Sequence, residues 1–480
     1  MAALIVCALC ALVILKPQEF VPALAGLPLL YVLFGAAIVI GLLFAAVGRL
    51  KLSLAPHLPF AAAFLMWAAV TTAIRRPTVI EKEGLELAVV FALFAVLGLF
   101  AGTSRGLKHF TIVFLGCALF VTAAALEQAE APYQCMLAAP DDWEGKGELE
   151  PDGRFCEVAY DCRKDAPDPD ANYRCERAGP FGTTTIGGRV RYRGSLADPN
   201  ELSLTAVLAI PFALALVDRK KGKRKPRAVP GLPLLVTDKL LGRVTTFFLW
   251  APVLAAIAAI AWMVIVSQSR TGVLVFMFIV GISFLRRVGP WGVVVGCVLF
   301  PPMLMFGGRS GAEAEASAEE RTELLAEALQ MIRQSKGIGV GVGQFGDESS
   351  IGLTAHNSYL LAAAETGLIG LCLFGLTLYL ALKVPISIWL GDYQIDNTLT
   401  RLAPALAIAI GGAYVGIFFL SWSYKDILYM LLGASAALYQ AARAQDPSVR
   451  VGMSGREAAL VCLGSLALLP VLYIFLHIRG

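Results

Sequence analysis

The chain has 480 residues and a formal net charge of +4; 57% of its residues are hydrophobic and only 16% are charged. Its mean hydropathy is +0.70. Soluble domains carry about 25% charged residues, so the composition excludes an ordinary soluble protein and indicates an all-α, polytopic integral membrane protein. The apolar segments are about 17 to 25 residues long, the length of a bilayer-crossing helix, and they are too long and uniform for barrel strands.

Taken in chain order, the apolar segments predict about 12 to 13 transmembrane helices. Residues 2–15 lack a basic segment before them and a clear cleavage site, so we expect a retained helix rather than a signal peptide. The predicted spans are 2–16, 27–47, 56–74, 85–102, 109–126, 199–217, 245–266, 271–286, 290–306, 357–383, 402–420, 426–442 and 457–477.

Basic residues predict the orientation of these spans, because lysine and arginine collect on the cytoplasmic side of a membrane protein. The strongest basic cluster, Arg219–Arg227, is predicted to be cytoplasmic, and the N-terminus lies on the same side in the assignment that satisfies most basic segments. Arg75 and Arg76 are the exception, since this assignment places them outside.

This orientation gathers the polar segments at one face of the protein. The predicted regions are N-terminal helices (1–126), a periplasmic loop (127–198), central helices (199–306) with a basic cytoplasmic loop (218–243), a second periplasmic loop (307–356) and C-terminal helices (357–480). The turns Ser267–Thr271 and Ser421–Asp426 are predicted to face the periplasm as well. We therefore expect a functional site on that side.

Four of the ten cysteines lie together in the first periplasmic loop: Cys135, Cys156, Cys162 and Cys175. An oxidising compartment favours two disulfides, and the sequence leaves their connectivity open. A four-thiolate zinc site is the alternative, but the spacing lacks a Cys-x-x-Cys pair. No other metal-ligand spacing occurs on the periplasmic side, so neither a metal nor a cofactor is required.

The same loop contains an acidic segment, Asp165–Asn172, that is similar to a calcium-binding loop. It departs from the EF-hand pattern, because Tyr173 stands where the turn needs glycine and Gly179 stands where a bidentate glutamate belongs. We therefore expect a solvated acidic loop that disulfides hold in place.

In the second periplasmic loop, residues 318–334 predict an amphipathic helix. Its apolar stripe consists of Leu324, Leu325, Ala328, Leu329, Met331 and Ile332. Arg321 falls within this stripe. A guanidinium on a buried face is costly unless it meets an anion, so Arg321 is a candidate anion ligand. The alternative is that its side chain reaches water past the end of the helix.

Further arginines precede and interrupt the central spans. Arg270 lies between two apolar spans that almost no loop joins, where an arginine is usually paired or functional; an interfacial anchor is the alternative. Arg189, Arg191 and Arg193 alternate ahead of Asp198-Pro-Asn200, which puts them on one face of an extended segment. Guanidinium binds phosphate bidentately and keeps its charge, so the set suits a phosphate-bearing ligand.

A glycine-rich segment, Gly337–Gly346, comes shortly before the span at 357–383. Its one Gly-x-Gly-x-x-Gly match, which includes Gly341 and Gly343, lacks the strand–turn–helix context of a dinucleotide site. No Walker motif occurs, and no nucleic-acid partner is expected. Close approach of the backbone to a phosphate-bearing ligand or to another helix is the better interpretation.

His356 is one of four histidines and is predicted to lie in the first turn of the span at 357–383. The start of a helix disfavours the imidazolium form, which keeps such a histidine neutral and able to act as a base. A helix-capping role is the alternative. Glu365 lies on the opposite face of the same helix, and we expect it to be a structural partner for a buried donor.

Four blocks of this chain together resemble the O-antigen ligase and O-antigen polymerase superfamily of bacterial membrane glycosyltransferases, in the order of that family. They are Arg193–Asn200, Ser267–Gly272, Arg321–Leu329, and Gly337–Gly370 with its His-Asn-Ser-Tyr-Leu core. The first five spans are generic, and the cysteine-containing loop is not a feature of the family. The resemblance implies a GT-C-like fold with about twelve spans and both ends inside, whereas thirteen would place the C-terminus outside.

The resemblance also implies roles for individual residues. The family histidine corresponds to His356, the loop arginine to Arg321 and the arginine between the central spans to Arg270. Arg193 and Arg191 are both candidates for the arginine before the Asp-Pro-Asn block, with Arg193 preferred. Residues expected to support the site are Asn357, Tyr359, Gly341, Gly343 and Glu365.

These features predict a metal-independent, inverting glycosyltransferase in the bacterial inner membrane, with its active site facing the periplasm. The implied donor is a glycan on undecaprenyl pyrophosphate, and the pathway is the synthesis of O-antigen, lipopolysaccharide or exopolysaccharide. The acceptor is a glycan, lipid A-core or another hydroxyl, so a ligase and a repeat-unit polymerase both remain open. A transporter or flippase for lipid-linked sugars is the alternative of another class; it would show internal repeats and charges along a pathway, which the sequence lacks.

Overall fold

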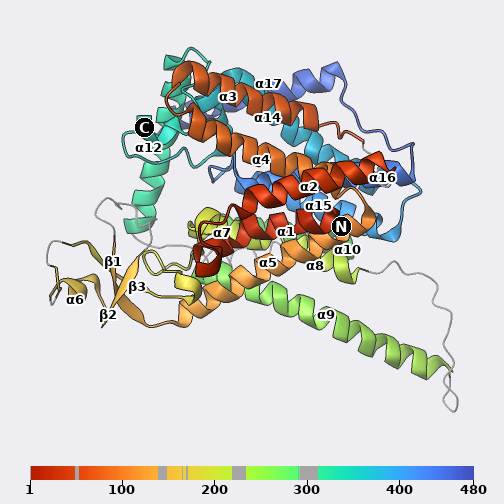
Figure 1. The fold of residues 1–480 in the computed structure, drawn as a ribbon, viewed down its shortest axis with the longest axis horizontal. Coiled ribbons are helices and arrows are strands. Elements are labelled where there is room, and N and C mark those ends of the chain that lie inside the picture. The colour runs from red at the N-terminus through yellow and green to blue at the C-terminus, as the bar shows by residue number, and fades with distance from the viewer. Residues whose placement is uncertain are drawn as a thin grey trace.

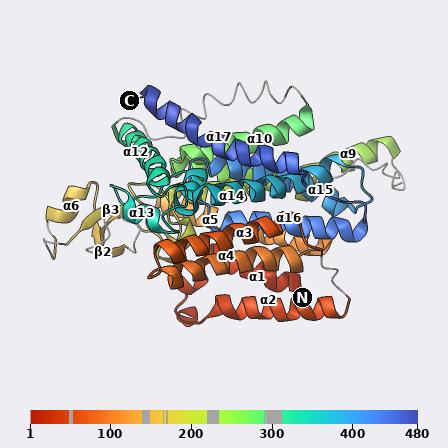
Figure 2. The ribbon, with the colours of Figure 1, turned by 90° about the horizontal axis from the view of Figure 1, so that it is seen from above.

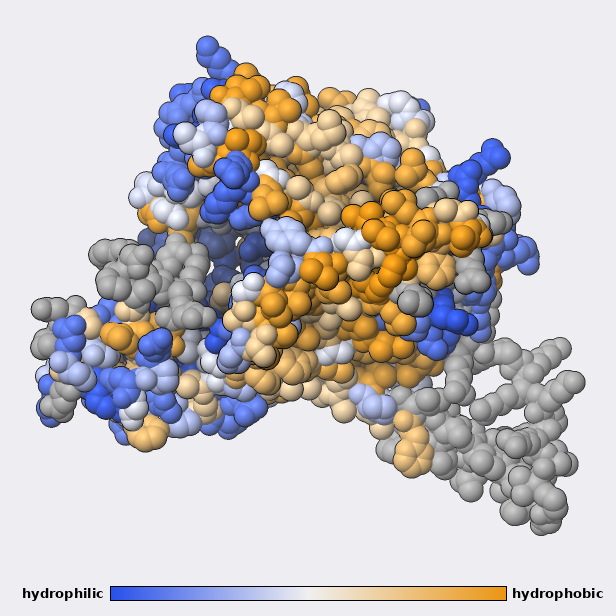
Figure 3. Space-filling view, in the orientation of Figure 1, coloured by the Kyte–Doolittle hydropathy of each residue, from blue (hydrophilic) through white to orange (hydrophobic). Residues whose placement is uncertain are grey.

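Long apolar helices make up most of this computed structural model, which describes residues 2–48, 53–138, 149–164, 166–168, 171–218, 234–289, 291 and 312–479. They form a bundle with hydrophilic residues at its two ends and an apolar surface between them (Figures 1 and 3). The helices are α1 (Ala2–Leu15), α2 (Leu29–Ala46), α3 (Leu58–Arg75), α4 (Ile80–Phe100), α5 (Ser104–Glu130), α6 (Ala159–Lys164), α7 (Pro199–Val207), α8 (Ile210–Val217), α9 (Leu234–Val266), α10 (Arg270–Val288), α12 (Ala312–Gln334), α13 (Gln344–Glu348), α14 (Ser358–Leu390), α15 (Asn397–Gly416), α16 (Asp426–Gln445) and α17 (Gly455–Arg479).

The helices confirm the predicted fold class, a mainly helical polytopic membrane protein. Among the described residues, eight helical segments are long and apolar enough to cross a membrane: α2, α3, α4, α5, α7 with α8, α14, α15 and α17. Every predicted span that falls on described residues coincides with a helix. The predicted span at 290–306, apart from residue 291, and the basic cluster Arg219–Arg227 lie outside the described residues.

The core of the bundle surrounds α16, in which every residue from Ile427 to Ala442 is buried. Close contact with α4 depends on small residues, because a side chain at Gly433 would approach the Phe94 carbonyl oxygen to 2.9 Å. At the periphery, only 6% of the apolar window of α17 is buried and 17% of that of α2. These two helices therefore present most of their surface to the lipid.

The ends of the described chain lie at opposite ends of the bundle (Figures 1 and 2). Arg479 lies at the end that carries α12 and the β-sheet, and the apolar C-terminal half of α17 packs against α12 through Leu472. Ala2 lies at the other end. Such a placement requires an odd number of crossings between them, which matches a count of thirteen and differs from the twelve that the resemblance implies.

The first long loop contains a small β-sheet, which the sequence analysis did not predict. Strands β1 (Tyr133–Leu137), β2 (Glu150–Phe155) and β3 (Tyr173–Arg177) pair antiparallel in the order β2-β1-β3. The structure forms both predicted disulfides and resolves their connectivity as Cys135–Cys162 and Cys156–Cys175. Of the acidic segment at residues 165–172, residues 165, 169 and 170 lie outside the described residues.

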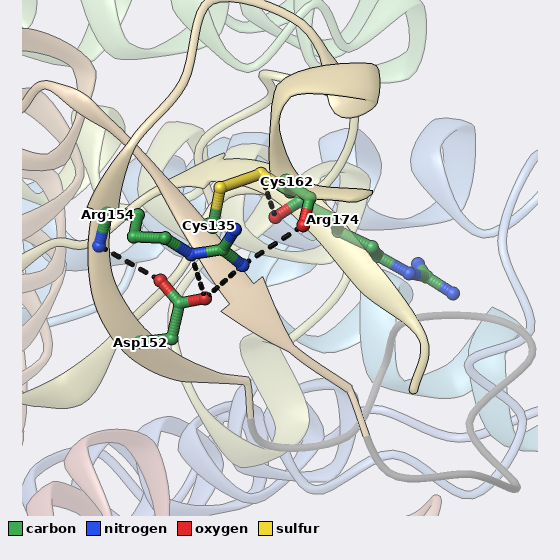
Figure 4. Close-up of polar contacts among 5 residues, drawn as sticks. All are labelled: Cys135, Asp152, Arg154, Cys162 and Arg174. Atoms are coloured by element: carbon green, nitrogen blue, oxygen red, sulfur yellow. Dashed lines mark hydrogen bonds and ion pairs between the residues drawn. A yellow bond between two sulfur atoms is a disulfide. The ribbon is translucent and has the colours of Figure 1, made fainter. Parts of the chain in front are cut away.

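An ion pair supports the disulfide-bonded part of this loop (Figure 4). The Arg154 Nε donates to Asp152 Oδ2 at 2.8 Å, and Nη2 donates to the Cys162 carbonyl at 3.0 Å. Although burial opposes the effect, the hydrogen bonds and charge of Arg154 lower the pKa of Asp152. The three sulfur atoms of Cys135, Cys156 and Cys162 lie within 4.8 Å of one another, but all are engaged in disulfides.

Removing the Cys135–Cys162 bridge should loosen this loop without unfolding the helical bundle. The bridge closes a separation of 27 residues, so a C135S/C162S variant should lose about 3 to 4 kcal/mol of loop stability. Limited proteolysis should then cut residues 131–188 faster in the variant than in the wild type. Cys462→Ser, which removes a thiol outside any disulfide, is the matched control, and equal cutting rates in all three proteins would contradict the assignment.

Candidate functional site

A break in α14 organises the end of the bundle that carries α12. Gly367 adopts a left-handed conformation with φ of 72° and interrupts the helix. A break leaves carbonyl groups without their intrahelical partners, and the glycine-rich segment supplies the donors: Val340 N donates to Ala364 O and Gly341 N to Glu365 O, both at 2.9 Å. Of the two predicted interpretations of this segment, close approach to a helix is the one the structure shows.

Glycine is required at the closest contacts of this pairing. A side chain at Gly367 would collide with the Gly337 carbonyl, and one at Gly339 would collide with the Glu365 carbonyl. Gly341 and Gly343 have φ of 105° and 74°, conformations that other residues rarely adopt. Both predicted supporting glycines therefore shape the backbone of the loop.

Two arginines at the end of α3 attach to the same loop. Arg75 Nη2 donates to the Ser335 carbonyl at 3.0 Å, and Arg76 Nη2 lies 2.7 Å from Glu348 Oε1. These are the residues that departed from the positive-inside pattern. Their contacts give a physical reason for that departure, because they hold a loop on the side where the sequence analysis placed them.

The amphipathic helix α12 begins at Ala312, before the predicted start at residue 318. Its predicted stripe is buried against α14 and α17, with Leu324 and Ala328 fully buried. Arg321 is half-buried and lies well inside the helix rather than near its start. Reaching water past the helix end is therefore not the explanation for its position.

His356 lies before α14 and not in its first turn, which corrects the sequence prediction. Asn357 is the N-cap, since its side chain accepts a hydrogen bond from Leu360 N at 3.0 Å. His356 is half-buried and has a φ of 48°, and its backbone N–H donates to Ser421 Oγ at 3.0 Å. Helix capping is thus assigned to Asn357 rather than to His356.

Ser358 joins the start of α14 to the turn between α15 and α16. Its Oγ donates to the Leu420 carbonyl at 2.6 Å and accepts from Trp422 N at 2.7 Å, while its carbonyl accepts from Ser423 Oγ at 2.7 Å. Tyr359 donates to the Tyr414 carbonyl at 3.3 Å. The predicted supporting residues Asn357 and Tyr359 therefore fix the backbone that carries His356.

The Asp-Pro-Asn block meets the turn between α9 and α10. Ser269 Oγ donates to Asn200 Oδ1 at 2.9 Å, and Ser203 Oγ lies 2.6 Å from Ser267 Oγ. Arg189 completes the contact, because its Nε donates to the Ser267 carbonyl at 2.9 Å. Arg270 is the first residue of α10 and is exposed. Arg189 belonged to the alternating set, but no feature of the sequence distinguished it from Arg191 and Arg193.

Arg191 and Arg193 hold the loop that leads into α7. Arg191 is buried, and its Nε donates to the Thr184 carbonyl at 2.9 Å. Arg193 donates to three backbone carbonyls, those of Phe181, Gly182 and Glu19. These contacts change the interpretation of the two residues, because the predicted pyrophosphate ligands stabilise the local backbone in this structure.

A cavity of about 640 Å³ lies at this end of the bundle, beside His356. Thr354 and Ser421, which flank or contact His356, line it, and so does Ser195 from the Arg193–Asn200 block. Its other polar lining residues are Lys16, Glu83, Glu86, Glu365, Tyr424, Lys425 and Asp426. Most of these come from the ends of separate helices and belong to no motif, so sequence reasoning missed all of them except Glu365.

Residues 255–375 match a protein-family model described as O-antigen ligase. The matched segment runs from α9 into α14 and includes the α9–α10 turn, α12, the glycine-rich segment and His356. The match confirms the resemblance predicted from the sequence blocks. No curated protein matches the chain at a significant level.

The steric requirement at the break in α14 gives a direct test of this architecture. Gly367→Ala should lower thermal stability and separate the loop from α14, because the new methyl group collides with the Gly337 carbonyl and φ is positive. We expect a loss of about 2 kcal/mol or more, measured as a lower unfolding midpoint in detergent. Gly346→Ala is the control, since its methyl group meets its nearest atom at an ordinary 3.5 Å. An unchanged midpoint for Gly367→Ala would refute the pairing.

Proposed function

We propose that this multi-pass membrane protein, whose residues 255–375 belong to the O-antigen ligase family, transfers a glycan from a lipid-linked pyrophosphate to an acceptor hydroxyl. The family match supports an O-antigen ligase-like activity in surface polysaccharide synthesis. Undecaprenyl pyrophosphate as the carrier, inversion at the anomeric carbon, independence of metals, and a site on the periplasmic face of the inner membrane are parts of the proposal.

The conformation of His356 is the observation that carries this proposal. A left-handed φ in a residue other than glycine costs about 1 to 3 kcal/mol and persists where the surrounding structure enforces it, often at functional sites. Here Ser421 holds the backbone of His356, while Asn357 performs the capping. The imidazole therefore lies just before the N-terminus of α14, on a backbone that Ser421 holds and at a position that is not the cap.

In the proposed reaction, His356 accepts the proton of the acceptor hydroxyl. The hydroxyl oxygen forms a bond to the anomeric carbon of the donor, and the bond from that carbon to the pyrophosphate oxygen breaks with its electron pair. Attack in line with the leaving group inverts the centre. General-base catalysis of this kind typically contributes about 10²- to 10⁴-fold in rate.

The departing pyrophosphate gains negative charge, which arginines are suited to stabilise. We assign this role to Arg270 and Arg321, one exposed at the start of α10 and one half-buried within α12. Arg191 and Arg193 support the backbone that leads to the Asp-Pro-Asn block. Preorganised cations act more strongly where water is scarce, as at the membrane interface.

Replacing His356 tests the assignment of the base. His356→Ala should reduce transfer by at least about 100-fold and leave binding of the lipid-linked donor nearly unchanged, because the arginines remain. The measurement is transfer and donor binding with purified protein in liposomes. His477→Ala removes an exposed histidine that stacks on Tyr473 near the end of α17 and serves as the control. Wild-type transfer by His356→Ala would show that another group is the base.

The glycan profile of a deletion strain identifies the acceptor, since a ligase and a repeat-unit polymerase share the donor. We expect full-length chains to accumulate on the lipid carrier, as the description of the matched family indicates. Electrophoresis of the cell-surface glycan and mass spectrometry of the lipid fraction measure this outcome. Single repeat units left on the acceptor would instead identify a polymerase.

A further inference from the structure

Two residues that line the 640 Å³ cavity, Glu365 and Tyr424, each carry a buried polar atom without a well-formed hydrogen bond, although their side chains lie close enough to interact with each other. The side chain of Glu365 is buried, with the residue 2% exposed; its Oε1 accepts from Phe345 N at 3.3 Å, while Oε2 is unsatisfied. The hydroxyl of Tyr424 is also buried and unsatisfied. Buried polar atoms are nearly always hydrogen-bonded, so this pair indicates a place for a ligand.

The two groups have complementary chemistry. Burial and then the charge of the neighbouring Glu365 raise the pKa of Tyr424 well above its ordinary value, so the phenol keeps its proton and donates. The Glu365 oxygen accepts. A hydroxyl group both donates and accepts one hydrogen bond readily, and one hydroxyl placed between them satisfies both.

The remaining charges make the cavity acidic. Four carboxyl groups line it, from Glu83, Glu86, Glu365 and Asp426. The two lining lysines have acidic neighbours outside the lining, since Lys425 lies 3.3 Å from Glu201 and Lys16 lies 3.5 Å from Glu19; the charges of both lysines also act on Asp426. Glu83 has Lys82 at 3.7 Å, but that lysine is highly exposed and screens it weakly. An anionic ligand is therefore disfavoured, whereas hydroxyl and ammonium groups are favoured.

Apolar side chains from α2 and α4 also line the cavity: Leu30, Tyr31, Leu85, Leu87, Val89 and Val90. Tyr31 is 55% exposed, so its ring is accessible. A cavity of this volume lies within the range of about 300 to 1,000 Å³ that small-molecule sites occupy. A lining that combines hydrogen-bonding groups with apolar side chains matches the polar edge and apolar face of a sugar ring.

We propose that this cavity binds a neutral or amino-bearing sugar of the substrate, with Glu365 and Tyr424 sharing one of its hydroxyl groups, and that it rejects acidic sugars. This inference rests on the proposed function, because a sugar held here lies beside His356, next to Thr354 and Ser421. Glu365 and Tyr424 are then specificity-determining residues, and the exposed Glu86 supplies the charge that excludes carboxylates.

Binding of free monosaccharides to the purified full-length protein in nanodiscs tests the proposal without requiring transfer. Saturation-transfer difference NMR with a neutral hexose, an N-acetylhexosamine, a hexosamine and a hexuronic acid measures which sugars contact the protein. We expect signals from at least one neutral or amino sugar and none from the hexuronic acid. In Tyr424→Phe and Glu365→Gln the signal should fall at least tenfold.

The substitutions retain the packing of the site. Phenylalanine at position 424 keeps the ring stacked on Phe64, and glutamine at position 365 keeps an oxygen for Phe345 N. Tyr379→Phe is the matched control, because Tyr379 lies in the part of α14 beyond Gly367 and its hydroxyl donates to Glu457 of α17. Its signal should equal that of the wild type. If Glu365→Gln fails to fold, the sugar signal of Tyr424→Phe alone tests the proposal. Glu86→Gln should admit the hexuronic acid.

Three outcomes would overturn the inference. The first is the absence of a signal from any sugar, which would mean that water alone occupies the cavity. The others are equal signals in the wild type and Tyr424→Phe, and a stronger signal from the hexuronic acid than from the other sugars. Sugar binding that depends on Tyr424 in a protein whose transfer is insensitive to His356→Ala would overturn the proposed mechanism and leave this site standing. If transfer depends on His356 but sugar binding is unaltered in Tyr424→Phe, the sugar site would be overturned and the proposed mechanism would stand.

Discussion

The carbonyl groups exposed at the break in α14 are the constraint on which this end of the protein depends. Backbone polar groups in apolar surroundings must find partners inside the protein, and Gly367 leaves those of Ala364 and Glu365 without their helical donors. The glycine-rich segment satisfies them with Val340 N and Gly341 N. Because the partners are backbone atoms, the loop must approach without side chains, and the glycines follow from that requirement. The pairing in turn places Glu365 and the loop together at the wall of the cavity.

The position of His356 depends on a second set of contacts, in which Ser358 is the centre. One hydroxyl and one carbonyl of this residue bind three positions of the turn between α15 and α16. Ser421 in the same turn then holds the backbone of His356. Two segments that are far apart in the sequence thus fix the residue from both sides, and the left-handed conformation is the result of this double attachment.

Much of the fold follows from the sequence because apolar length and charge are properties of single segments. The helices, the amphipathic stripe of α12 and the presence of two disulfides needed no knowledge of neighbours. What the sequence could not supply is pairing between segments: which cysteines join, where the strands of the first loop meet, and which helix the glycines approach. His356 was predicted to lie in the first turn of α14, whereas it lies just before the N-cap, because Asn357 and not the histidine accepts a hydrogen bond from the first N–H groups of the helix. The cavity was missed for the same reason, since Lys16, Glu86 and Lys425 come from three helices and are unremarkable in each.

The basic and acidic residues assigned to the proposed site come from different helices, and this separation suits the proposed reaction. A transfer from pyrophosphate to a hydroxyl requires cations beside the leaving group and hydrogen-bond acceptors beside the sugar. A cavity with charges of one sign provides only one of these two environments. The two arginines assigned to the leaving group, Arg270 and Arg321, come from α10 and α12, whereas the carboxyl groups that line the cavity come from α4, α14 and α16. The two sets thus belong to different helices, and His356 stands at the start of α14, the helix that carries Glu365. If the proposed roles hold, this separation would let the protein bind an anionic leaving group and a hydroxyl-bearing sugar without either set of charges neutralising the other.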